Sequence, residues 1–188
     1  MFIKTFHDVV MQQFGDYPIK VIVLRRHLAS ALKSFITMGY FSDRNQAWPS
    51  WMHLPGTCGS EFQPPVLDRN PDQYELAIGY LIDIEARAQR FRQRYPFCEV
   101  HDVRLESLQD PSQVESFFRE LQLEPGPQTL RVAGWPVNQR TRRKVEIGIK
   151  TTLEYCEQRI VEYLRVCREH GVRVPVLPQI SPSVHGPA

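Results

Sequence analysis

The sequence predicts an α/β domain of three layers, in which helices cover both faces of a mainly parallel β-sheet. Residues 19–24 are apolar apart from Lys20, a pattern typical of a buried parallel strand. Helical patterns follow at 28–38 and 72–94, and a second strand pattern comes at 97–105. Strands that alternate with helices are typical of parallel sheets, and 188 residues suffice for one such domain with its own core.

The first half of the chain combines short strands with a long loop. Residues 2–5 favour a short strand, and residues 7–14 favour a loop or a short helix. The helix at 28–38 is expected to end at Gly39, because glycine accepts the backbone conformation that terminates helices. Residues 41–71 form an irregular, proline-rich loop insertion, and a loop of this length is usually functional or mobile.

The second half of the chain contains three predicted helices with recognisable ends. One follows Pro71, one begins at Asp110-Pro111, and the last begins at a Thr151–Glu154 capping box and stops at Gly171. Their expected buried residues are Leu76, Leu81, Ile84, Ala88 and Phe91 in the first, Val114, Phe117, Phe118 and Leu121 in the second, and Leu153, Cys156, Ile160, Leu164 and Cys167 in the third. We therefore expect one domain over residues 1–171 and a proline-rich, loosely ordered tail over 172–188.

Composition excludes several classes of protein. The net charge of +2 does not indicate a nucleic-acid-binding surface, so any anion site must come from local placement of arginines. No apolar run reaches the ~18 residues of a membrane span, and the N-terminus does not resemble a secretory signal. Four cysteines lack CxxC spacing, which disfavours a zinc site and favours buried thiols in a reduced, cytoplasmic protein.

The stretch KVIVLRRHLASALKS, residues 20–34, has the order expected of an anion-binding site. A strand runs into an arginine pair, and a helix opens behind it with a serine further along. Arginine offers a planar fork of donors to a phosphate, and a helix N-terminus adds amide donors and partial positive charge. Arg26 and Ser34 are eight residues apart. The alternative is a surface arginine and a helix serine that contact no ligand.

This stretch resembles the segment of the sulfotransferase family that binds the 3′-phosphate of the sulfate donor PAPS. The family has a strand, an arginine and a serine eight residues later, which match Arg26 and Ser34. Upstream, Ile3-Lys4-Thr5-Phe6-His7 is similar to the family's Lys-Thr-His stretch, with an additional phenylalanine before the histidine. The resemblance implies His7 as catalytic base, with the loop shifted by one residue, and Lys4 as an electrostatic helper. A histidine or lysine that ends a strand in solvent is the alternative.

The resemblance extends in order along residues 2–170. Residues 103–111 look like the family's strand-end glutamate, here Glu106, followed by an Asp-Pro helix start, and residues 117–123 fit the pattern that comes next. Glu106 could equally cap a turn. Residues 138–144 resemble the family's C-terminal phosphate-binding loop, which implies a second clamp on the 3′-phosphate from Arg140, Arg142, Arg143 or Lys144. Such a basic tract is otherwise solvated surface.

The chain departs from the family in one respect. Sulfotransferases carry an N-terminal strand, glycine-rich loop and helix that grip the 5′-phosphosulfate, and no counterpart precedes residue 2. Residues 55–60 resemble that loop only superficially, since they lack its lysine and follow no apolar strand, so we expect a turn-rich loop there. Trp48, Trp51, Met52 and Phe62 could line an acceptor pocket or lid, or form a hydrophobic cluster beneath the loop.

The resemblance implies an N-terminally incomplete sulfotransferase fold of the P-loop NTPase type. Its activity would be sulfuryl transfer from PAPS to a hydroxyl or amine of a small-molecule or carbohydrate acceptor, without a metal. A missing segment or a second subunit would have to supply the phosphosulfate loop. The alternatives are a non-catalytic sulfotransferase-like module and a fragment of a P-loop kinase. A kinase should show acidic magnesium ligands at a strand end, for which Asp102 is the candidate.

Overall fold

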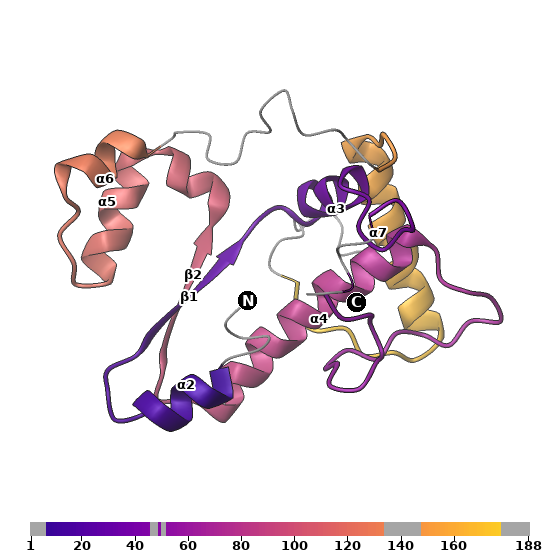
Figure 1. Cartoon of the computed structure of the whole chain (residues 1–188), viewed down its shortest axis with the longest axis horizontal. Coiled ribbons are helices and arrows are strands. Elements are labelled where there is room, and N and C mark those ends of the chain that lie inside the picture. The colour runs from indigo at the N-terminus through magenta and orange to yellow at the C-terminus, as the bar shows by residue number, and fades with distance from the viewer. Residues whose placement is uncertain (1–6, 46–48, 50–51, 134–147, 178–188) are drawn as a thin grey trace.

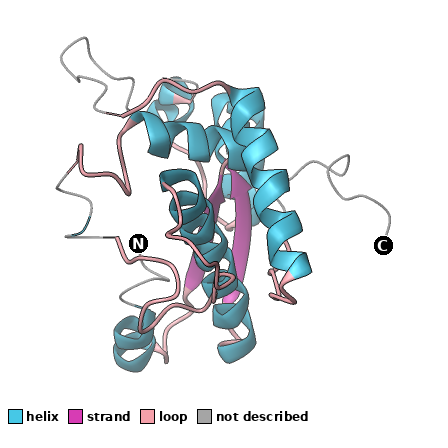
Figure 2. Ribbon diagram, turned by 90° about the vertical axis from the view of Figure 1, so that its right-hand side faces the viewer, coloured by secondary structure: helices cyan, strands magenta, loops and turns pink. Residues whose placement is uncertain are grey.

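The structure is a computed structural model that describes residues 7–45, 49, 52–133 and 148–177. Two strands, β1 (Lys20–Arg25) and β2 (Glu99–Arg104), pair in parallel from Lys20 opposite Glu99 to Arg25 opposite Arg104. Helices lie on both sides of this pair (Figure 2). The described residues therefore form a mixed α/β fold with a two-stranded parallel sheet, which confirms the predicted class but shows fewer strands than a three-layer sheet implies.

One face of the sheet is covered by helix α4 (Gln73–Arg94) together with α2 (His7–Phe14). Val21 and Val23 of β1 pack in one cluster with Ala88 and Phe91 of α4 and with Met11 of α2. These side chains project to one side because successive strand residues alternate between faces. The buried cluster fixes the direction of β1 against the C-terminal half of α4.

The opposite face of the sheet is covered over β2 only. His101 and Val103 of β2 are buried there, whereas their neighbours Ile22 and Leu24 on β1 are about half exposed. The apolar run had predicted burial on both faces of β1, and this expectation is wrong for Ile22 and Leu24 among the described residues. Their exposure arises because the helices that cover β1 all contact its other face.

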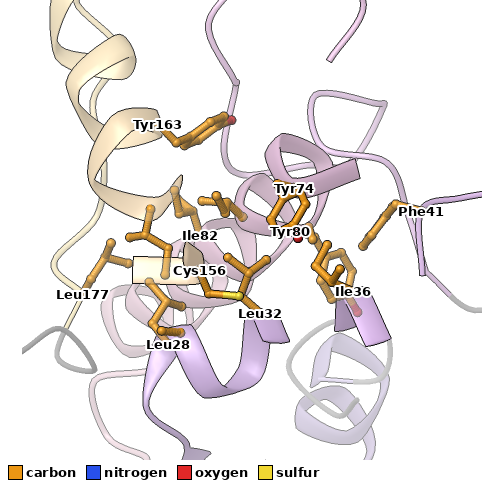
Figure 3. Close-up of a cluster of buried hydrophobic side chains, with 14 of the residues drawn as sticks. Leu28, Leu32, Ile36, Phe41, Tyr74, Tyr80, Ile82, Cys156, Tyr163 and Leu177 are labelled. Carbon is orange, nitrogen blue, oxygen red and sulfur yellow. The ribbon is translucent and has the colours of Figure 1, made fainter. Parts of the chain in front are cut away.

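The main core is formed by three helices that lie side by side: α3 (Leu28–Thr37), the N-terminal half of α4, and α7 (Leu153–Glu169) (Figure 1). The buried side chains drawn in Figure 3 come from all three helices and from the segments that flank them. Cys156 and Cys167 are completely buried on α7 and make no disulfide. The two thiols thus act as small apolar core groups, as their spacing predicted.

The ends of the helices follow local chemistry. Asp72 caps α4 reciprocally with Glu75. Gly39 and Gly171 follow α3 and α7 with positive φ angles of 69° and 66°, as predicted for residues that terminate helices. The cap of α7 differs from the expected capping box, because Thr152, not Thr151, accepts the hydrogen bond and Tyr155 occupies the third helical position.

A smaller helical unit follows β2. It consists of the 3₁₀ helix η2 (Leu105–Gln109), α5 (Pro111–Glu120) and α6 (Pro127–Val132), at the far end of the molecule from α7 (Figure 1). Asp110 caps α5 as predicted, through the amide of Ser112. Val114 and Leu121 are buried, but Phe117 and Phe118 are only half-buried, because within the described residues α5 contacts only η2 and α6 extensively.

The buried surface of α4 is wider than the predicted stripe. Ala88 and Phe91 are buried as expected, whereas the other three stripe residues are only partly buried. The fully buried side chains of the N-terminal half are instead Ala77, Ile78 and Ile82. Helix α4 contacts α3, α7, the loop before it and the sheet, so more than one of its faces is buried.

The described part of the long loop is anchored to α4 by a buried carboxylate. Oδ1 of Asp83 accepts hydrogen bonds from the Ser60 hydroxyl at 2.8 Å and from the amides of Glu61 and Phe62 at 2.6 and 3.0 Å. Its other oxygen pairs with Arg87 at 2.7 Å. Because these donors neutralise a buried charge, they hold the loop in one position against the helix.

Beyond α7 the chain continues along the core. Val172 and Val174 pack against the main cluster, and Leu177 is buried. Residues 178–188 and the predicted strand at 2–5 lie outside the described residues.

Candidate anion-binding site at the end of strand β1

The two neighbouring arginines at the end of β1 have different environments. Arg25 is buried and points toward α4, where it donates three hydrogen bonds of 3.0 to 3.2 Å to the buried carboxylate of Glu85. It also pairs with Asp102 on β2, which Arg92 of α4 contacts in turn. Arg25 therefore ties the end of β1 to α4 and to the neighbouring strand.

The charge of Arg25 is stabilised by these partners. Burial alone would lower the pKa of the guanidinium, but the hydrogen bonds to Glu85 and Asp102 outweigh this effect, and the pKa is raised. The guanidinium stays charged and engaged inside the protein. A phosphate would have to displace Glu85 to reach it, which makes Arg25 a structural residue.

Arg26 is exposed and has no hydrogen bond or ion pair to any part of the chain that the structure describes. It lies between the carboxyl end of β1 and the first residue of α3, the edge at which parallel sheets bind ligands (Figure 1). Strand alternation explains the difference between the two arginines, since Val21, Val23 and Arg25 share the buried face and the chain turns after them.

The N-terminus of α3 lacks a side-chain cap. His27 occupies the N-cap position, and its side chain makes no capping hydrogen bond. The amide of His27 donates a 3.3 Å hydrogen bond to Glu106, which follows β2. Glu106 thus contacts the backbone amide of the N-cap residue and leaves the amides of the first turn of α3 without a side-chain cap. The amide groups of the first turn of α3 face the end of the sheet without a capping residue, which suits an anion.

Ser34 lies on α3 on the side opposite the buried residues. At 100° per residue it points about 180° from the middle of the face that carries Leu28, Leu32 and Ile36. Side chains on a helix lean toward its N-terminus, so the Ser34 hydroxyl is directed toward the end at which Arg26 lies. It is about 9 Å along the axis from Leu28.

Ser30 lies one turn before Ser34 on the same face and nearer Arg26, and it was not among the predicted site residues. Both serines are half-buried. The i, i+4 spacing of the two hydroxyls was visible in the sequence and could have indicated that they share a face.

The C-terminal end of α3 receives the chain that returns from the basic tract. Gly148, four residues after Lys144, donates a 3.0 Å hydrogen bond to the carbonyl of Thr37. A Cβ at this glycine would overlap the Ile36 carbonyl oxygen and lie 2.6 Å from the Gly39 nitrogen. Only a glycine allows the chain to approach α3 this closely. The chain that follows the tract is therefore fixed one turn beyond Ser34.

Several predicted site residues lie outside what the structure describes. These are Lys4, the side chain of His7, whose backbone begins α2, the basic residues Arg140, Arg142, Arg143 and Lys144, and the tryptophans Trp48 and Trp51. Met52 and Phe62 are described, and both belong to the main hydrophobic core. They fit the hydrophobic cluster that was the alternative to an acceptor pocket.

The structure also shows the surroundings of two weaker candidates. Residues 55–60 form a turn-rich loop as expected, with Gly56 and Gly59 at positive φ. Asp102, the candidate magnesium ligand of a kinase, lies within β2 and is paired with Arg25 and Arg92. Among the described residues no group of three or more His, Cys, Asp or Glu side chains gathers in a metal-binding arrangement.

Comparisons with known proteins add no assignment, because no family model, curated protein or solved structure matches this chain. Within the described ranges, no helix is long and apolar enough to cross a membrane.

Proposed function

We propose that the protein is a PAPS-dependent sulfotransferase of the cytoplasm, which binds the 3′-phosphate of PAPS at the end of β1. The guanidinium of Arg26 donates hydrogen bonds to the phosphate, and the hydroxyls of Ser34 and Ser30 are further donors. The tract with Arg142, Arg143 and Lys144 closes over the same phosphate. The observation that carries the proposal is the difference between two neighbouring arginines. Arg25 is bound by Glu85, whereas Arg26 is exposed beside a helix N-terminus that has no side-chain cap.

The proposed reaction transfers a sulfuryl group to the hydroxyl or amine of a small-molecule or carbohydrate acceptor. The acceptor atom forms a bond to sulfur while the bond from sulfur to the bridging phosphate oxygen breaks, and PAP leaves. His7 takes the acceptor proton as general base, and Lys4 stabilises the negative charge that develops on the bridging oxygen. The 5′-phosphosulfate loop of the family fold comes from a further segment or a second subunit.

Calorimetric titration with PAP tests the nucleotide site, with adenosine 5′-monophosphate as the ligand that lacks the 3′-phosphate. The wild-type protein should bind PAP at least about tenfold more tightly than the monophosphate, because only PAP presents a phosphate to Arg26. Arg26→Ala should weaken PAP binding by about 10- to 100-fold, the range expected for hydrogen bonds to a charged group. Arg131→Ala, which removes an exposed arginine on α6, is the matched control and should change nothing.

The position of Glu106 provides a second, opposite test. Its carboxylate lies at the start of α3, so it should repel a phosphate bound there. Glu106→Gln keeps the shape of the side chain and should strengthen PAP binding severalfold, most clearly at low salt. Unchanged affinity in both Arg26→Ala and Glu106→Gln would place any bound nucleotide elsewhere. If PAP binds but no sulfuryl group is transferred from PAPS to any acceptor tested, the protein is a non-catalytic module.

A further inference from the structure

A pocket lies away from the β1 site, between the long loop and helices α4 and α7. Its volume is about 290 Å³. The apolar part of its walls comes largely from prolines, namely Pro55, Pro64, Pro65 and Pro71, with Leu67 and Leu76, and polar side chains complete the lining. A pocket of this size and lining suits a small organic molecule.

The walls of the pocket are held in place before any ligand arrives. Proline restricts the backbone of the loop, and Asp83 anchors the residues between Pro55 and Pro64 to α4. Gly79 of α4 lets the loop approach, because a Cβ there would lie 3.0 Å from two atoms of the Pro55 ring. A preformed pocket saves the ligand the free energy of ordering the loop.

Two charged side chains line the pocket, and they neutralise each other. Arg69 makes a bidentate pair with Glu75, at 2.7 and 2.5 Å. The Glu75 carboxylate also accepts a 2.8 Å hydrogen bond from the backbone amide of Asp72, as part of the cap of α4. A charged ligand would have to separate this pair, so the pocket favours a neutral one.

Tyr163 of α7 supplies a polar group that is not engaged. It is 5% exposed and lines the pocket, and its hydroxyl has no hydrogen-bond partner in the described parts of the chain. Figure 3 shows its ring extending from α7 with the hydroxyl at the outer end. Burial raises the pKa of this hydroxyl, so it remains a neutral donor. The hydroxyl opens onto the pocket, so a bound ligand can accept a hydrogen bond that a phenylalanine at this position could not donate.

We propose that this pocket binds a neutral, apolar ligand whose single hydroxyl or carbonyl oxygen accepts a hydrogen bond from Tyr163. The prolines and leucines contact the apolar body of the ligand, and the Arg69–Glu75 pair stays closed at the rim. The proposal is independent of PAPS binding, since none of its residues belongs to the β1 site.

The experiment uses two fluorinated probes that differ by one hydroxyl, 6-fluoro-2-naphthol and 2-fluoronaphthalene, followed by ¹⁹F NMR titration. Both should bind the wild-type protein saturably, and the naphthol more tightly. Tyr163→Phe should weaken naphthol binding by about three- to tenfold, the value of one hydrogen bond, and leave fluoronaphthalene binding unchanged. Tyr155→Phe, on the exposed side of the same helix, is the matched control and should alter neither affinity.

A second variant makes the test independent of that hydroxyl. Leu67→Trp places an indole in the pocket from the loop side and should abolish binding of both probes. The proposal is overturned if the wild-type protein binds neither probe, if Tyr163→Phe affects both probes equally or neither, or if Leu67→Trp binds both as before. PAP binding should be the same in all three variants. A failure of the pocket proposal can therefore be distinguished from a failure of the proposed PAP site at Arg26.

Discussion

Removal of one member of the buried Arg25–Glu85 pair should destabilise the protein strongly, whereas removal of the whole pair should not. Three hydrogen bonds join the side chains of Arg25, which is 7% exposed, and Glu85, which is 3% exposed. Arg25→Met removes all three hydrogen bonds and leaves the Glu85 carboxylate buried without them. Breaking such a buried pair costs about 3–5 kcal/mol. That is a large part of the 5–15 kcal/mol typical of a whole domain.

The double variant Arg25→Met, Glu85→Met replaces the pair by apolar side chains of similar length. Its free energy of unfolding should lie within about 1–2 kcal/mol of wild type, because no charge is left buried without its partner. Asp102 loses one partner in this variant, but it is half exposed and keeps Arg92. Urea denaturation of the wild type, both single variants and the double variant completes a mutant cycle.

The cycle also separates the two arginines. The double variant should bind PAP with nearly wild-type affinity, since Arg25 has a structural role and Arg26 is unchanged. The reasoning is refuted if the double variant is as unstable as the sum of the single variants, or if it is stable but loses PAP as completely as Arg26→Ala does.

Three further variants or reagents probe other parts of the structure. Gly148→Ala should lower the free energy of unfolding by about 1–3 kcal/mol in urea, because its Cβ overlaps the backbone of α3; no change would refute the close approach. The hydrogen bond from Arg69 lowers the pKa of Glu75 below its usual 4.5, so the wild type should be more stable than Glu75→Gln above that pH, by no more than about 1 kcal/mol because Arg69 is largely exposed, and the difference should vanish as the pH falls through the lowered pKa. A constant difference from pH 6 to 3 would contradict this. In the native protein, Ellman's reagent should modify exposed Cys58 at least about a hundredfold faster than Cys167, whose pKa burial raises to about 11, and equal rates would contradict its burial.

The elements with strong local signals could be predicted from the sequence. Strand β1 and helices α3, α4 and α7 lie within one or two residues of their expected bounds, because apolar periodicity and end residues such as Asp72 and Gly171 act over short ranges. The buried face of α4 could not be predicted in the same way. It depends on which elements pack on it from far along the chain.

The roles of the two arginines illustrate the same limit. Spacing to Ser34 favoured Arg26 over Arg25, but the partner that engages Arg25 is Glu85, which is 60 residues away in the sequence. Likewise, the role of Glu106 at the start of α3 required β1 and β2 to be neighbours. The proline-lined pocket left no local signal, because Tyr163 and Pro55 come together only through the packing of α7 and the loop on α4.

A crystal structure of the protein with PAP is the most direct measurement of the proposed nucleotide site. We expect density for the 3′-phosphate at the N-terminus of α3, within hydrogen-bond distance of the Arg26 guanidinium and of the Ser30 or Ser34 hydroxyl, with Arg25 still paired to Glu85. PAP bound at any other position, or a crystal saturated with PAP that shows no density at this end of β1, would contradict the proposal.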